Sequence, residues 1–163
     1  MSGWKAADEI PVAHTPSGGY DEVPDPILGG CGEGIVKGAP DLRGWWEVTE
    51  VVADGALSPD HPMMGLRQRI EQCGDRFVVT AGGVVHDGRA DGTEENGVND
   101  VAEFDFTTPI TVVATYEDGV HFLRPVGLPV EVTRTVEDGR LVWVYAGTET
   151  RSRYLGPVDE VPQ

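Results

Sequence analysis

The chain has 163 residues, which is enough for one domain with a substantial hydrophobic core. Its 28 acidic and 12 basic residues give a formal net charge of −16. This charge argues against nucleic acid and anionic membrane surfaces as partners, because both would repel the protein. No run approaches the roughly 20 apolar residues of a membrane span, and the N-terminus lacks the apolar core of a signal peptide. We therefore expect a cytoplasmic protein, monomeric or homodimeric.

Residues 1–38 differ in composition from the rest of the chain. They contain four prolines and two Gly-Gly pairs, and they show no apolar periodicity. We expect a flexible Gly/Pro-rich tail that is disordered or draped over the domain and dispensable for folding. The two cysteines, Cys31 and Cys73, do not make a disulfide framework. A catalytic thiol at Cys31 is a weak alternative, because no histidine partner can be identified for it.

Residues 39–163 are predicted to form an all-β domain. The pairs Asp118-Gly119 and Asp138-Gly139 lie between alternating apolar runs, which is the strongest short-range signal for a β-hairpin. A meander of many short strands must hide its edges, and closure into a barrel does so. The predicted fold is a single antiparallel up-and-down β-barrel of about ten strands. The strands are expected at residues 45–52, 66–72, 76–81, 83–87, 101–106, 111–117, 120–124, 130–136, 140–145 and 149–155.

The start of this domain resembles a known family. Its segment Asp-Leu-Arg-Gly-Trp-Trp-Glu-Val contains Gly44-x-Trp46, and Gly-x-Trp marks the first strand of lipocalins and fatty-acid-binding proteins, the calycin barrels. The resemblance implies that Gly44 lets the chain turn into the barrel and that Trp46 plugs its closed end. It also implies an arginine of the last strand, Arg151 or Arg153, as a cation–π lid over the tryptophan. In fatty-acid-binding proteins an Arg-x-Tyr pair of the last strand binds the ligand carboxylate, whereas this chain has Arg151-Ser-Arg153-Tyr at that place. The two arginines share one strand face and the tyrosine points to the other.

The expected function is binding of a small apolar or amphipathic molecule in a hydrophobic cavity, without a cofactor. Trp143 and Tyr145 share one face of a strand and would make a wall for a flat apolar ligand; hydrophobic core or a dimer surface is the alternative. Arg134 lies among valines and would be costly to bury without an anion. Exposure, or pairing with a neighbouring glutamate, is the alternative for this arginine. Tyr116, on the strand 111–117, completes the predicted ligand-binding set.

The sequence contains fewer candidate residues for catalysis than for ligand binding. The four histidines have no metal-ligand spacing, so no metal site is predicted. His61, in the loop 58–65, and His86, at the end of a strand, are candidates for a general acid–base group or a haem ligand at the barrel mouth. The alternative function is therefore a lipocalin-fold enzyme, a cofactor-free cyclase or isomerase of biosynthesis that acts on an apolar substrate in the same cavity. An interaction module that uses the acidic surface is a third hypothesis.

Overall fold

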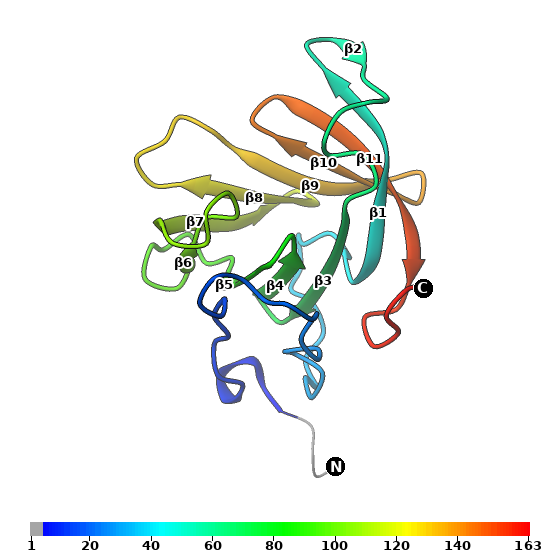
Figure 1. Cartoon of the computed structure of the whole chain (residues 1–163). Coiled ribbons are helices and arrows are strands. Elements are labelled where there is room, and N and C mark those ends of the chain that lie inside the picture. Colours follow the sequence, from blue (N-terminus) through cyan, green and yellow to red (C-terminus); the bar gives the residue numbers. More distant parts are fainter. Residues whose placement is uncertain (1–4) are drawn as a thin grey trace.

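β-Strands dominate the chain from residue 44 onward (Figure 1). The structure is a computed structural model that describes residues 5–163. A short 3-10 helix, η1, covers Ala7–Glu9. No helix within this range is long and apolar enough to cross a membrane. The strands are β1 (Gly44–Ala53), β2 (Ala56–Leu57), β3 (Arg67–Cys73), β4 (Arg76–Ala81), β5 (Val84–Arg89), β6 (Val98–Val101), β7 (Pro109–Glu117), β8 (Val120–Pro125), β9 (Val132–Glu137), β10 (Arg140–Tyr145) and β11 (Thr148–Gly156).

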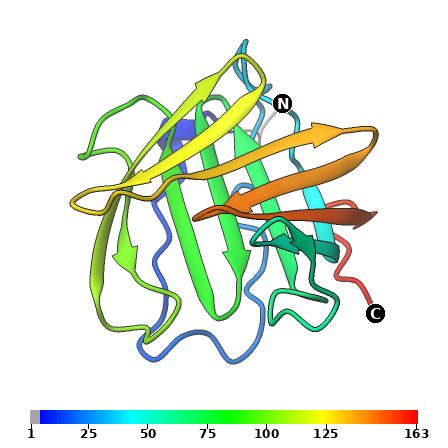
Figure 2. The same cartoon turned by 90° about the horizontal axis from the view of Figure 1, so that it is seen from above.

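Ten of these strands form one antiparallel wall in the order β5-β4-β3-β1-β11-β10-β9-β8-β7-β6, and β2 pairs only with β1. Pairing of β1 with β11 joins the first part of the barrel to the last. Each strand therefore lies beside its neighbours in the chain, as in an up-and-down barrel, and in the view from above the yellow and orange strands cross over the green ones (Figure 2). The predicted fold class is confirmed.

The barrel is nearly closed, because β5 and β6 lack a ladder of backbone hydrogen bonds in the part of the chain that the structure describes. We call this junction the seam. Two bonds cross it directly. The amide of Arg89 donates to the carbonyl of Asn96 at 2.7 Å, and the His86 ring Nε2 lies 2.9 Å from the carbonyl oxygen of Val101.

Turn chemistry explains where most strands end. Asp118 and Asp138 have φ angles of 48° and 52°, and each is followed by a glycine that also has positive φ. This is the geometry of the tight hairpin turns that the Asp-Gly pairs predict. The strand predicted at residues 101–106 is wrong, because β6 ends at Val101 and a turn follows it. Phe106 has a φ of 58°, and its amide bonds the carbonyl of Ala102, which bends the chain away from an extended path.

One half of the barrel interior is filled by a cluster of apolar side chains. Trp46 is 4% exposed in this cluster, and its indole Nε1 donates to the carbonyl of Leu42 at 2.9 Å. The expected lid over Trp46 is not formed. Arg153 pairs with Glu47 on the outer side of the barrel, and Arg151 likewise pairs with glutamates. The ring of Tyr154 instead meets Trp46 edge-on at a centroid distance of 5.3 Å. This ring also covers Gly44, where a Cβ atom would collide with it.

Residues 5–38, which we call the strap, lie against the outer face of β3, β4 and β5 (Figures 1 and 2). Arg76 of β4 is buried beneath the strap, where it pairs with Asp87 of β5 at 2.7 Å and donates to the carbonyls of Ala7, Ile10 and Pro11. Apolar residues of the strap and of the barrel form a second cluster there: Ala7, Leu28, Cys73, Val78 and Val85. The strap is therefore draped over the domain in this structure, and its dispensability for folding stays a prediction.

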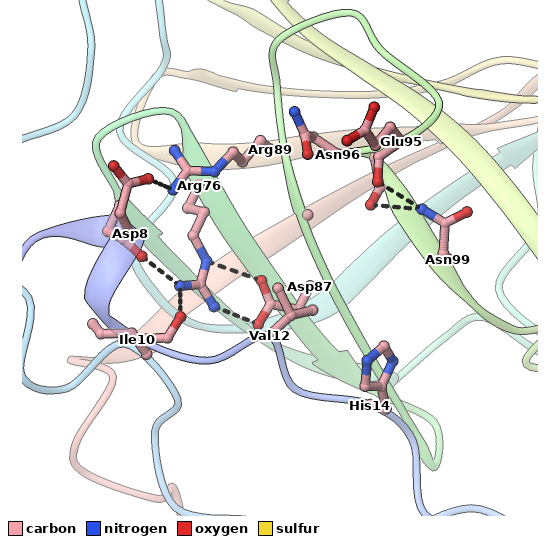
Figure 3. A pocket seen from close by; sticks show the side chains of 13 residues that line it. Asp8, Ile10, Val12, His14, Arg76, Asp87, Arg89, Glu95, Asn96 and Asn99 are labelled. Atoms are coloured by element: carbon pink, nitrogen blue, oxygen red, sulfur yellow. Dashed lines mark hydrogen bonds and ion pairs between the residues drawn. The ribbon is translucent and has the colours of Figure 1, made fainter.

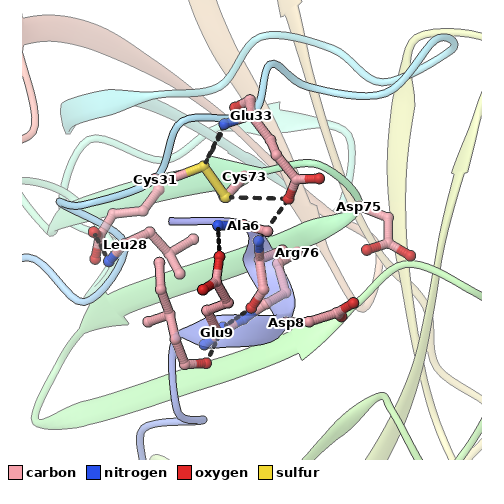
Figure 4. The surroundings of a disulfide bond; sticks show 12 residues. Ala6, Asp8, Glu9, Leu28, Cys31, Glu33, Cys73, Asp75 and Arg76 are labelled. Carbon is pink, nitrogen blue, oxygen red and sulfur yellow. Dashed lines mark hydrogen bonds between the residues drawn. A yellow bond between two sulfur atoms is a disulfide. The ribbon is translucent and has the colours of Figure 1, made fainter. Parts of the chain in front are cut away.

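A disulfide joins the strap to the barrel. Cys31 is bonded to Cys73 at the end of β3, with a Cα–Cα distance of 6.0 Å (Figure 4). Cys31 is therefore not the free thiol that a catalytic nucleophile requires. A disulfide also sits poorly with the expected cytoplasmic location, because the cytosol keeps thiols reduced.

Candidate functional site in the barrel cavity

A cavity of about 240 Å³ lies in the barrel interior beside the apolar cluster. Strand alternation places the inward side chains of β4, β5, β7, β8, β9 and β10 around it. Most of these side chains are apolar, and they include Val79, Val84, Ile110, Val112, Leu123 and Val132. Val79 and Val112 also belong to the apolar cluster, so the cluster forms the floor of the cavity. Such a lining suits an apolar molecule.

Arg134 of β9 is the buried charge of this cavity. It is 5% exposed, its Nε donates to Gln68 Oε1 at 2.9 Å, and its guanidinium carbon lies 5.2 Å from the centroid of the Trp143 ring. Within residues 5–163, neither Arg134 Nη1 nor Trp143 Nε1 has a hydrogen-bond partner. Burial lowers the pKa of Arg134 to about 10, against an opposing effect of the Glu103 charge. Two buried donors of neighbouring side chains therefore lack a protein acceptor, and a buried donor without an acceptor is costly.

The mouth of the cavity combines an apolar rim with one polar contact. Phe104, in the turn after β6, is 76% exposed, and Leu66 and Leu128 are also exposed on the rim. The hydroxyl of Tyr145 donates to Glu103 Oε1 at 3.0 Å. Burial, followed by the Glu103 charge, raises the pKa of Tyr145. This hydrogen bond connects β10 to the turn after β6 at the mouth.

The floor beside Arg134 holds a second buried polar side chain. His121 of β8, the cross-strand neighbour of Arg134, is 1% exposed and lies edge-on to Phe77 at a centroid distance of 4.4 Å. Burial, followed by the Arg134 charge, lowers the pKa of His121 to about 3. Tyr116 lies 5.0 Å from the same ring, and burial raises the pKa of Tyr116 to about 12. The floor is therefore uncharged at neutral pH, and Arg134 is the nearest cation to the cavity interior.

The structure brings three of the four predicted ligand-binding residues together. Arg134, Trp143 and Tyr145 line the cavity, whereas Tyr116 lies in the floor, where its hydroxyl accepts a hydrogen bond from Gln72 at 3.0 Å. Their binding role stays a prediction.

The two candidate catalytic histidines are not brought together. His86 lines the cavity and bonds across the seam. His61 does not line this cavity; its Nδ1 accepts the amide of Met63 at 3.1 Å within the loop 58–65. No group of three or more potential ligands for a metal ion occurs in the described range.

Three residues of the cavity and its floor were not predicted from the sequence: Gln68, Glu103 and His121. Gln68 is on β3, where alternation separates two faces that both carry polar side chains, so the pattern does not indicate which face is internal. Glu103 lies in the segment that was predicted as a strand. His121 alternates with Phe122, and either side chain is a plausible internal residue.

No family model, curated protein sequence or solved structure matches this chain. Over the described residues, the molecule is a nearly closed up-and-down β-barrel of ten antiparallel strands with an internal cavity.

Proposed function

We propose that this barrel binds a small amphipathic molecule, with an apolar body in the cavity and an acidic group on Arg134. The observation that carries the proposal is the pair of buried, unpartnered donors, Arg134 Nη1 and Trp143 Nε1, in a cavity whose wall is otherwise largely apolar. An arginine donates readily to a carboxylate, and charge-assisted hydrogen bonds are the strong ones at buried sites. A carboxylate at this position would accept hydrogen bonds from the two donors that no protein group pairs.

A place among the lipocalin-like calycin barrels is part of this proposal. The up-and-down strand order, the Gly44-x-Trp46 sequence at the first strand and the internal cavity support it. The catalytic alternative has less support. Of its two candidate histidines, His61 does not line the cavity, and His86, which lines it, is bonded across the seam to the carbonyl of Val101. Binding is therefore the function that the cavity supports best.

The experiment is a titration with decanoate, followed by tryptophan fluorescence, with decanol as a neutral ligand of matched chain length. Arg134→Met should weaken decanoate binding roughly 10- to 100-fold, because a hydrogen bond to a charged group is worth about 1.5–3 kcal/mol. Decanol binding should change little. Arg140→Met removes an exposed arginine of β10 and serves as the matched control. Equal losses for decanoate and decanol, or no saturable decanoate binding by the unmodified protein, would contradict the proposal.

A further inference from the structure

The seam borders the cavity at the position where the barrel wall has the fewest direct bonds. Val84 and His86 of β5 line the cavity on one side of the seam, and Ala102, which follows β6, lines it on the other. Between these residues the direct link is the single contact from His86 Nε2 to the carbonyl of Val101. Elsewhere in the wall, adjacent strands are paired by backbone hydrogen bonds. The seam is therefore the part of the wall that can open at the lowest cost in hydrogen bonds.

The strap bridges this seam from outside. The amide of Ala13 donates to Asp87 of β5 at 2.9 Å, and the amide of Thr15 donates to Asp100 of β6 at 3.0 Å. The hydroxyl of Thr15 also accepts the amide of Val85 at 2.9 Å. Thr15 therefore bonds both sides of the seam through its own main chain and side chain. These contacts replace part of the ladder that β5 and β6 do not form with each other.

The bridging part of the strap is fixed at both ends and less tightly packed between them. Near residue 20, the ring of Phe106 presses on the backbone of Gly19 and Gly83, where a Cβ atom would come within 3.2 and 2.8 Å of the ring. Arg76 holds residues 7–11, as described above, and the disulfide retains the strap on the barrel.

A polar groove of about 330 Å³ separates strap residues 8–14 from the segment 95–99 that leads into β6 (Figure 3). In this view His14 and Asp8 lie on one side, and Glu95 and Asn99 lie on the other. The groove leaves space for residues 12–16 to move while both anchors hold.

We propose that the seam is the portal through which the ligand reaches the cavity, and that strap residues 13–16 are the gate that closes it. This inference rests on the proposed function. The gate opens when Thr15 and Ala13 release β5 and β6, which lets the wall part beside His86. The anchors at Arg76 and at the disulfide keep the strap in place for reclosure.

The test is stopped-flow binding of decanoate to the full chain carrying Thr15→Val. This change removes the hydroxyl that bonds Val85 and keeps the shape of the side chain. The hydroxyl accepts the amide of Val85 at 2.9 Å and donates to the carbonyl of Val85 at 3.4 Å. A gate affects the barrier to passage in both directions. The association and dissociation rate constants should therefore rise together, roughly 5- to 10-fold for the loss of these contacts, with Kd unchanged within about twofold. Amide exchange of Val85 should accelerate in the same variant without ligand.

Thr49→Val is the matched control. The Thr49 hydroxyl donates to the carbonyl of Arg151 at an irregularity in the pairing of β1 with β11, and the strand pairs on both sides of it hold this part of the wall, away from the seam. Its loss should leave both rate constants unchanged. Unchanged rates in Thr15→Val, or a faster dissociation alone with weaker binding, would overturn the portal and leave the proposed function intact. Absence of saturable binding by the unmodified protein would instead overturn the proposed function, and the portal with it.

Discussion

Replacement of Arg134 by methionine should leave the protein at least as stable as before. Burial lowers the pKa of Arg134 from 12.5 to about 10, which corresponds to roughly 3.5 kcal/mol of unfavourable free energy for the charged form at about 1.4 kcal/mol per pKa unit. The lost hydrogen bond to Gln68 offsets about 1.5–3 kcal/mol of this gain. The expected net effect lies between no change and a stabilisation of about 2 kcal/mol.

Arg76→Met is the matched comparison, because Arg76 is also a buried arginine of the barrel wall but has a full set of partners. It pairs with Asp87 and donates to three carbonyls of the strap. Removal of one member of a buried pair costs about 3–5 kcal/mol. Urea unfolding followed by circular dichroism measures both variants. A decrease of more than about 2 kcal/mol in the unfolding free energy of Arg134→Met would refute the reasoning, since it would show that this side chain stabilises the fold and is not kept for binding an anion.

Two further predictions concern the barrel interior. Trp46→Ala should destabilise the protein by about 3–5 kcal/mol in chemical denaturation, the usual cost of truncating a buried large aromatic; a loss below about 1 kcal/mol would show that Trp46 does not support the core. His121 should make the protein less stable as the pH falls from 6.5 towards 3, because burial lowers its folded-state pKa to about 3 and the unfolded chain therefore takes up the proton first. The titratable or charged groups facing His121 are Tyr116 and Arg134. His121→Phe should remove up to about 5 kcal/mol of the change in stability between pH 6.5 and pH 3. Equal pH dependence of the two proteins would show that His121 is not buried in its neutral form.

The part of the fold that could be predicted from the sequence is the part governed by local chemistry. Asp118-Gly119 and Asp138-Gly139 adopt positive φ whatever surrounds them, so the hairpins of the second half were correctly placed. The bounds of β6 were not, because the segment 102–106 turns at Phe106, whose ring lies against Gly19 and Gly83, and these contacts are distant in the sequence.

The cavity could be predicted in part from the sequence, whereas the contacts that dock the strap could not. Arg134 and Trp143 were expected near a ligand because an arginine among valines and an aromatic pair are unusual on a strand, and both line the cavity. The strap has no apolar periodicity because it is not a regular strand or helix: its main chain bonds charged residues of the barrel, and its apolar side chains contact the barrel at irregular intervals. The charged residues that hold it, Glu71 and Arg76, lie on the outer face of the barrel, where such residues are normally solvated.

This mode of attachment has a consequence for how the protein tolerates variation. Arg76 donates to the carbonyls of Ala7, Ile10 and Pro11, and Glu71 accepts the amides of the chain at residues 27 and 28. Every peptide unit offers these groups whatever side chain it carries. At these positions the strap can therefore vary in amino-acid identity and still dock in the same register. A single charge reversal at Glu71 or Arg76 should free the chain around these residues, while the Cys31–Cys73 disulfide still retains the strap.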